Sequence, residues 1–273
     1  MTRSAQILST GSYVPDRVVT NAEIDQLMGE TTADWLVANV GIRERRWMSP
    51  EQTTSDLVTA AAQRALDKAG VRPEQLNLII VSTDTPDYLS PGTSVVVQHK
   101  LGAVNAGAYD VNSACAGWVT ALDQGARTIA TDSAMNYVLV AGGYGMSRFL
   151  DLSDKKTANL FADGAGAAVL GVGDTPGFLA SNFLAKGEYY DALGIYGGGA
   201  ACPTGTTCTM DAMNPMDPLK NSYRCTLSGS LVSTGKSCAM DVLYADRPGH
   251  FRIAGIDAAR AAEGVIALDI PAA

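Results

Sequence analysis

Two unbroken apolar runs constrain most strongly what this chain can fold into. They are "LNLIIVSTD" at residues 76–84 and "NYVLVAGGY" at residues 136–144. Runs of this kind, bounded by turns, are typical of strands that are buried on both faces of a sheet. Helical patterns alternate with them, at residues 53–69, 90–103 and 117–130. Because strands and helices alternate at least three times, the sequence predicts βαβ units: an α/β fold with a mostly parallel sheet and helices on both faces.

The remaining elements are read from shorter patterns. Further strands are expected at residues 5–15, 106–111, 164–173 and 176–187. Asn21 is expected to cap a short helix, and Thr31–Val40 predicts a second one that ends at Gly41. From about residue 201 the chain has no sustained helical or strand period, and this stretch holds four of the five cysteines and four of the nine methionines. The prediction there is an irregular segment.

Composition and charge exclude several classes of protein. The chain of 273 residues is 47% hydrophobic, enough for a sizeable core, and its net charge of −8 argues against a nucleic-acid-binding surface. No apolar run is long enough to span a bilayer, and residues 1–15 lack the apolar core of a signal peptide. The expectation is a cytoplasmic protein with no membrane partner. Five cysteines form no even disulfide framework, and their spacings match no common zinc pattern, so no metal site is predicted.

Cys115 is the candidate nucleophile. It lies in "DVNSACAGWVTAL", where a predicted strand ends and a predicted helix begins. The N-terminus of a helix stabilises a thiolate and lowers the pKa of the thiol, and the small neighbours Ala114, Ala116 and Gly117 leave room for a substrate. Its backbone N–H could also bind a developing oxyanion. The alternative is a small buried hydrophobic residue, as free cysteine is often buried.

Several segments together resemble one known family. They are "ILSTGSYVPDRVVTN", "DWLVANVGIRERRW", "LNLIIVSTDTPDYLSP", "QHKLGA", "DVNSACAGWVTAL", "FADGAGAAVLG" and "GIYGGGA", in this order over residues 5–200. They are similar to segments of the β-ketoacyl-acyl-carrier-protein synthase III family, within the thiolase-like condensing enzymes. The resemblance implies two similar halves, each with a five-stranded sheet, in αβαβα layers. It implies a complete N-terminal half at residues 1–175 with a mixed, mainly parallel sheet. The start of an incomplete second half would follow at 176–200 and a divergent tail at 201–273.

The resemblance also implies an activity in fatty-acid or polyketide synthesis. An acyl group from acyl-CoA, a substrate rather than a cofactor, would move to Cys115, and the acyl-enzyme would condense with malonyl-acyl-carrier protein. Trp35 would stack on the CoA adenine near Thr31, although it could instead pack a helix. Lys155 and Lys156 would supply positive charge for the CoA phosphates, with Arg148 a weaker candidate.

The chain departs from the family at several positions. Asn39 replaces an arginine on the adenine side, Lys155 replaces an arginine in the phosphate loop, and Ser90 stands where many members have a phenylalanine at the acyl pocket. The late motifs resembling "PHQAN" and "HGNTSAAS", which hold the catalytic histidine and asparagine, are absent from the 273 residues. His99 matches a position without a catalytic role, and His250 has no surrounding motif. Condensation is therefore expected to be slow or absent.

Three functions remain open at this point. The first is a synthase III-like acyltransferase. The second is an inactive truncated or frame-shifted relative that serves as a non-catalytic partner subunit. The third is acyl loading or thioester hydrolysis by Cys115 alone. The family pairs two nucleophile-bearing halves through the strand before the cysteine, here residues 106–111. The partner would be a second copy or a complete relative.

Overall fold

The computed structural model describes residues 3–150, 152, 157–175, 177–189, 194–195, 206–210, 223–227 and 251–252. The chain divides into two compact units. The first comprises Met1–Arg148 and Asn159–Phe183, and the second comprises Phe149–Ala158 and Leu184–Ala273. Each unit is described by itself.

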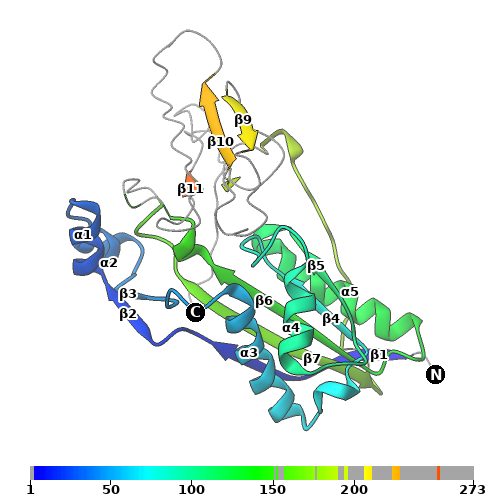
Figure 1. Ribbon diagram of the computed structural model, residues 1–273. Helices are drawn as coiled ribbons and strands as arrows, with labels where there is room; N and C mark the ends of the chain where they lie inside the picture. Colours follow the sequence, from blue (N-terminus) through cyan, green and yellow to red (C-terminus); the bar gives the residue numbers. More distant parts are fainter. Residues whose placement is uncertain are drawn as a thin grey trace. The chain divides into compact units, whose positions relative to one another are not determined.

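A five-stranded mixed sheet forms the centre of the first unit (Figure 1). Its order is β1-β7-β6-β4-β5. The strands are β1 (Ser4–Tyr13), β7 (Asp163–Gly173), β6 (Tyr137–Gly145), β4 (Leu78–Ser82) and β5 (Gly107–Val111). β4 pairs in parallel with both β5 and β6, whereas β7 runs antiparallel to both β6 and β1. Four strands therefore point the same way and β7 alone is reversed, which confirms the predicted mixed, mainly parallel sheet.

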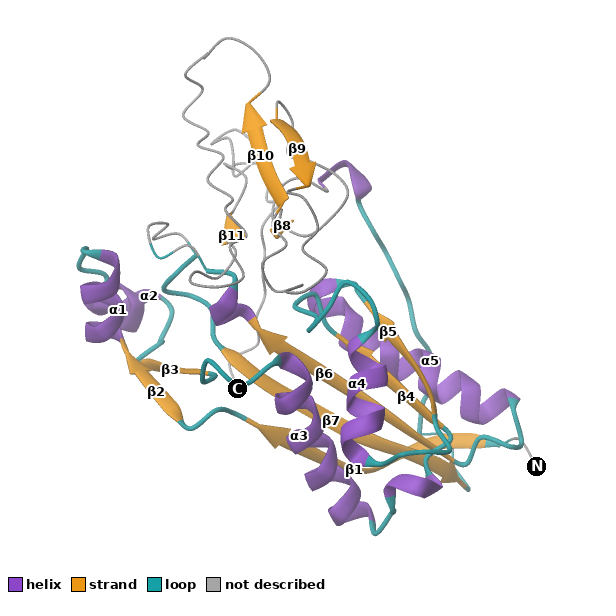
Figure 2. Ribbon diagram, viewed as in Figure 1, coloured by secondary structure: helices purple, strands orange, loops and turns teal. Residues whose placement is uncertain are grey.

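Helices cover both faces of this sheet, as Figure 2 shows. Helices α3 (Thr54–Ala69) and α4 (Thr93–Leu101) lie on one face and α5 (Gly117–Thr131) on the other. Alternate residues of β4 enter the two cores: Ile79 and Val81 pack under α3 and α4, and Leu78 and Ile80 pack under α5. This arrangement explains the unbroken apolar run, because a strand with a core on each face has no solvent side. Fully burying one such aliphatic side chain contributes about 1.5–3 kcal/mol.

A small α/β extension carries the residues predicted to meet CoA. The antiparallel strands β2 (Arg17–Thr20) and β3 (Glu44–Trp47) flank the helices α1 (Asn21–Met28) and α2 (Ala33–Asn39). The prediction that Asn21 caps α1 is wrong. Thr20 is the N-cap, and its Oγ1 accepts a hydrogen bond from the Glu23 N–H. Asn21 is buried instead, because its Oδ1 accepts a hydrogen bond from the Nη2 of buried Arg45 at 2.7 Å.

The strand predicted at residues 176–187 is also wrong. No strand forms over 178–186, and the side chains of Leu179 and Phe183 are exposed. A strand needs a backbone ladder and a buried face, and this apolar run has neither within the described residues. Four short 3₁₀ turns complete the described helical elements: Pro73–Gln75, Ala114–Ala116, Met146–Arg148 and Gly187–Tyr189.

The second unit contains four short strands among its described residues. β9 (Thr206–Met210) pairs with β10 (Tyr223–Leu227), and β11 (Phe251–Arg252) pairs with β8 (Gly194–Ile195), both antiparallel. The predicted irregular tail at 201–273 and the incomplete second half fall mostly outside the described residues and stay predictions, as does the boundary at residue 175. Among the helices that the structure describes, none is both long and apolar enough to cross a membrane.

Candidate active site

Cys115 lies on an exposed turn at the carboxyl end of the sheet. The 3₁₀ turn η2 (Ala114–Ala116) connects β5 directly to α5, so the thiol precedes the first residue of α5 by two positions. Ala114 has a φ of 44°, a left-handed conformation that costs a residue other than glycine energy. Cys115 itself is exposed, which contradicts the alternative of a small buried hydrophobic residue. The sequence-based placement of this residue between strand and helix is correct.

The start of α5 lies against the sheet at two positions. A Cβ built on Gly117 would lie 2.2 Å from the Oγ of Ser82, which no real side chain tolerates. The ring of Trp118 lies over Gly142 of β6, whose Cβ would be 3.4 Å from the Trp118 Cε3 atom. Gly117 therefore lets the start of α5 sit directly on the end of β4, whereas Gly142 and Trp118 are at ordinary contact distance.

Two ionisable residues at the same edge of the sheet were not predicted from the sequence. Asp84 follows the end of β4, and burial raises the pKa of its carboxyl group. Tyr144 lies near the end of β6, and its pKa is raised well above its ordinary value by burial and then by the neighbouring charges of Asp84, Cys115 and Asp163. The sequence did hold a signal, since both residues follow apolar runs of adjacent parallel strands, whose carboxyl ends meet at one edge of the sheet.

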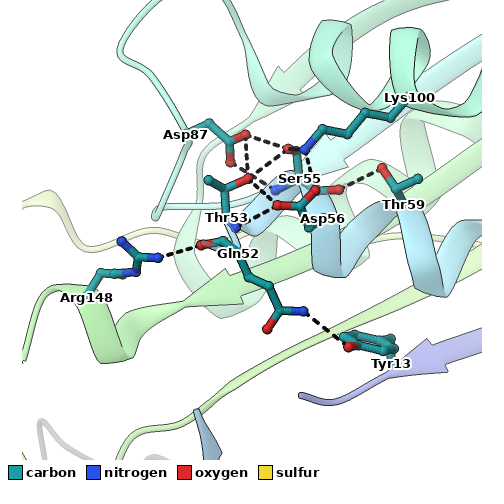
Figure 3. Close-up of polar contacts among 9 residues, drawn as sticks. All are labelled: Tyr13, Gln52, Thr53, Ser55, Asp56, Thr59, Asp87, Lys100 and Arg148. Carbon is teal, nitrogen blue, oxygen red and sulfur yellow. Dashed lines mark hydrogen bonds and ion pairs between the residues drawn. The ribbon is translucent and has the colours of Figure 1, made fainter. Parts of the chain in front are cut away.

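A polar network fixes the loop that follows β4, residues 83–92 (Figure 3). Asp87 of this loop accepts hydrogen bonds from the backbone N–H of Ser55 at 2.9 Å, from the Ser55 Oγ at 2.5 Å and from the Thr53 Oγ1 at 3.0 Å. Lys100 of α4 joins the same cluster through the Ser55 Oγ at 2.7 Å and an ion pair of 2.5 Å with Asp56. The network connects the loop at residues 83–92 to the N-terminus of α3 and to the C-terminal end of α4.

The charge balance of this network favours the ionised form of Asp56. Burial alone would raise the pKa of Asp56, but the Lys100 ammonium group and the hydrogen bonds from Thr53 outweigh it, so the pKa lies below its ordinary value. Thr53 and Asp56 also form a capping box at the N-terminus of α3. The negative charge of Asp56 therefore stabilises the N-terminus of α3, so Asp56 has a structural role.

Arg148, the weaker CoA candidate, is occupied by backbone carbonyls. Its Nη2 donates to the carbonyl oxygens of Ser49 at 3.0 Å and Gln52 at 2.6 Å, and also to that of Pro50 (Figure 3). These contacts fix the turn before α3 and engage the Nη2 group of the Arg148 side chain. Nearby Asp163 is buried, accepts a hydrogen bond from the Met48 N–H at 2.7 Å, and has its pKa raised by burial.

The other predicted site residues are distributed as follows. Trp35 on α2 is 55% exposed, which does not fit the alternative of a helix-packing aromatic residue, and Thr31 before the helix is exposed too. Lys155 and Lys156 lie outside the described residues. No group of three His, Cys, Asp or Glu side chains among the described residues could hold a metal ion.

The two histidines do not supply a partner for Cys115 in the described part of the chain. His99 is exposed on α4, which covers the opposite face of the sheet from α5. His250 lies outside the described residues. Among the described residues, Asp84 and Tyr144 are ionisable groups that the structure brings to this edge, and the charges of both Asp84 and Cys115 act on Tyr144.

Comparisons with known proteins give one consistent result. The family model for 3-oxoacyl-[acyl-carrier-protein] synthase III matches residues 109–187, which include Cys115. A β-ketoacyl-[acyl-carrier-protein] synthase III of Laribacter hongkongensis is 43% identical over 189 residues, covering 69% of this chain and 59% of that relative.

Solved structures agree with this match. The priming β-ketosynthase of the R1128 polyketide pathway has a TM-score of 0.61 at 40% identity, covering 64% of this chain and 52% of that one. The synthase III of Thermus thermophilus has a TM-score of 0.66 at 36% identity, covering 72% and 60%. The chain thus spans 52–60% of the length of these relatives. Over roughly its first 190 residues, the chain belongs to the β-ketoacyl-acyl-carrier-protein synthase III family and has the thiolase-like fold of that family.

Proposed function

We propose that this chain transfers an acyl group from acyl-CoA to Cys115 and forms an acyl-enzyme. The observation that carries the proposal is the exposed Cys115 thiol on the turn before α5, inside the segment that matches the family model. Transfer of an acyl group from a thioester to a cysteine thiol needs a thiolate nucleophile and donors for the transient oxyanion. The N-terminus of α5, which begins two residues after Cys115, supports both requirements because the positive end of a helix stabilises a thiolate and an oxyanion.

The second step of the family reaction is proposed to be slow in this chain. The 273 residues contain neither of the late motifs that hold the family's histidine and asparagine. General acid–base and electrostatic contributions are each worth roughly 10²- to 10⁴-fold, so losing this pair suppresses condensation while acyl loading persists. The natural acyl acceptor is proposed to be malonyl-acyl-carrier protein, as in the family.

Acyl loading and condensation are separated by one experiment. The whole chain is incubated with acyl-CoAs of several chain lengths, its intact mass is measured, and malonyl-acyl-carrier protein is then added. An acyl adduct without a condensation product is the expected result. Rapid release of a β-ketoacyl product would contradict the proposed loss of the second step, and no adduct with any chain length would contradict the acyltransferase.

Trp35 is proposed to hold the CoA adenine. Stacking of a base on an aromatic side chain is worth about 1–3 kcal/mol, so Trp35→Ala should weaken acyl-CoA binding by about tenfold. Trp35→Phe keeps a ring and should recover most of the loss. Val37→Ala is the control, since Val37 is also exposed on α2 but points about 200° away around the helix. Equal affinities of wild type and Trp35→Ala in equilibrium titration would remove Trp35 from the site.

A dimer is proposed through β5. This strand is at one edge of the sheet formed by the described residues, with β4 on its other side. An open edge presents unpaired N–H and C=O groups to a second strand. Light scattering should report twice the 28.4 kDa of one chain, or a complex with a full-length relative when one is present. A well-behaved monomer at high concentration would contradict this.

The non-catalytic partner subunit remains the second candidate. Apolar side chains of the first unit that are exposed favour it, among them Ile7, Leu179 and Phe183, because a large exposed apolar surface marks an interaction site. This function predicts a heterodimer with no adduct on Cys115. Cytoplasmic location stays a prediction from the sequence.

A further inference from the structure

Three neighbouring strands bring Asp84, Tyr144 and the Cys115 turn to one edge of the sheet. Ser82, the last residue of β4, pairs with Val111 of β5 on one side and with Gly142 of β6 on the other. Asp84 lies two residues beyond Ser82, Tyr144 lies two residues beyond Gly142, and Cys115 lies four residues beyond Val111. Asp84 thus belongs to the middle strand, between the strands that lead to Tyr144 and to Cys115.

Hydrogen bonds on both sides of Asp84 continue this alignment past the ends of the strands. The Thr83 N–H donates to the Val111 carbonyl at 3.1 Å, and the Gly145 N–H donates to the Thr85 Oγ1 at 2.9 Å. The residue before Asp84 is therefore tied to the end of β5, and the residue after it to the end of β6. Gly117 at the start of α5 touches Ser82 just below. The backbone of Asp84 is fixed at the base of the nucleophile turn.

Asp84 differs from other buried and half-buried aspartates in the hydrogen bonds that its carboxylate accepts. Asp87 accepts hydrogen bonds from Ser55, Asp110 from the N–H groups of Thr93 and Ser94, and Asp163 from Met48, so each satisfies backbone donors. No other described residue donates a hydrogen bond to the Asp84 side chain. A carboxylate that is desolvated without a structural partner costs stability, and such groups concentrate at functional sites.

We propose that Asp84 is the catalytic proton acceptor and donor of Cys115 in acyl loading, an inference that rests on the proposed function. The Asp84 carboxylate takes the proton of the Cys115 thiol, and the sulfur attacks the carbonyl carbon of the acyl-CoA thioester. When the bond between that carbon and the CoA sulfur breaks, the CoA thiolate takes the proton back from Asp84. The products are the Cys115 acyl thioester and free CoA, and Asp84 is again ionised.

The electrostatics of the three groups agree with this assignment. Burial raises the pKa of Asp84 toward that of a thiol, which makes it a stronger base than a surface carboxylate. Tyr144 has its pKa raised by burial and by the charges of Asp84, Cys115 and Asp163, so its phenol stays protonated and cannot be the base. The protonated Tyr144 hydroxyl is instead able to donate a hydrogen bond.

The test compares acylation with alkylation of the same thiol. Asp84→Asn should lower the single-turnover rate of Cys115 acylation by acyl-CoA by about 100-fold, the scale of a general base. Its rate with iodoacetamide should also fall near neutral pH, because alkylation needs the same Cys115 thiolate, and both rates should recover at high pH, where the thiol ionises without Asp84. Asp84→Glu should recover part of the acylation rate. The control Asp174→Asn removes one charge at the other end of β7 and should change neither rate.

Each contrary result overturns the proposal in a recognisable way. Unchanged acylation in Asp84→Asn shows that no base is lost, and a fall of both rates that persists at high pH shows that Asp84 only holds the turn. An acyl thioester of N-acetylcysteamine, which lacks the adenine and the phosphates of CoA, separates this proposal from the proposed function. Wild type that reacts with it but not with acyl-CoA refutes CoA as the donor, and the Asp84 variants are then compared with the small thioester. Wild type that reacts with neither overturns both proposals.

Discussion

Cys115→Ala is expected to leave the protein without a covalent acyl group after incubation with any acyl-CoA, whereas the wild type gains one acyl mass. The reason is that Cys115 is the exposed thiol placed at the N-terminus of α5, where a developing thiolate meets the positive end of the helix. Intact mass spectrometry gives the stoichiometry, and peptide mapping locates the group. Mapping is needed because the chain has four further cysteines after residue 200.

Two outcomes would contradict this prediction. An equal adduct on Cys115→Ala would place the nucleophile on another cysteine. An adduct on neither protein would leave the partner-subunit function as the better explanation. Cys115→Ser is the isosteric control, because it keeps the shape of the turn and replaces only the soft thiol.

Gly117→Ala is expected to lower the rate of acyl loading by about 100-fold without unfolding the sheet. The new Cβ would lie 2.2 Å from the Ser82 Oγ, so either the buried Ser82 side chain changes its rotamer or the start of α5 and the adjoining Cys115 turn move away from β4, and the second response is expected. A displacement of about 1 Å in reacting groups is enough for a loss of this size. The rate is measured as single-turnover acylation, and circular dichroism with thermal unfolding checks the fold.

A second substitution makes this prediction specific. Ser82→Ala removes the clashing Oγ and leaves the Ser82 Cβ, which is 3.4 Å from the new atom and in ordinary contact. The double variant Gly117→Ala with Ser82→Ala should therefore load acyl groups at nearly the wild-type rate. If the double variant is as slow as Gly117→Ala alone, the loss of acylation rate does not come from the contact with Ser82. It then comes from a changed backbone at the first residue of α5.

The local features of the sequence determined the elements of the first unit. The runs around Ile80 and Val140 are apolar at every position because β4 and β6 have a core on each face, and this requirement is readable without a structure. The ends of α3 are equally local, since Thr53 and Asp56 are three residues apart and Gly70 adopts the left-handed conformation that ends the helix. The position of Cys115 between β5 and α5 followed from the same local reading.

The predictions that failed depend on distant partners. Asn21 has the side chain of a typical helix cap, but its Oδ1 accepts a hydrogen bond from Arg45, which is 24 residues away in the sequence. Thr20 caps α1 instead. The apolar run at 178–186 has the composition of a strand, but strand formation is decided by an available neighbour. The N-terminus of α4 shows the reverse case, because its N-cap is Gly92 and Asp110 of β5 supplies the missing acceptor for Thr93 and Ser94.

The sequence by itself thus determined most strands and helices of the first unit and the place of the candidate nucleophile between β5 and α5, because these depend on burial patterns and on hydrogen bonds between near neighbours. The motifs also indicated the family. Only the tertiary structure decided that Asp84 and Tyr144 stand at the same edge as Cys115. That outcome depends on β4 lying between β5 and β6, with Ser82 in register with both Val111 and Gly142. Strand order and register are set by packing of the whole sheet and its helices, so no short stretch of sequence contains them.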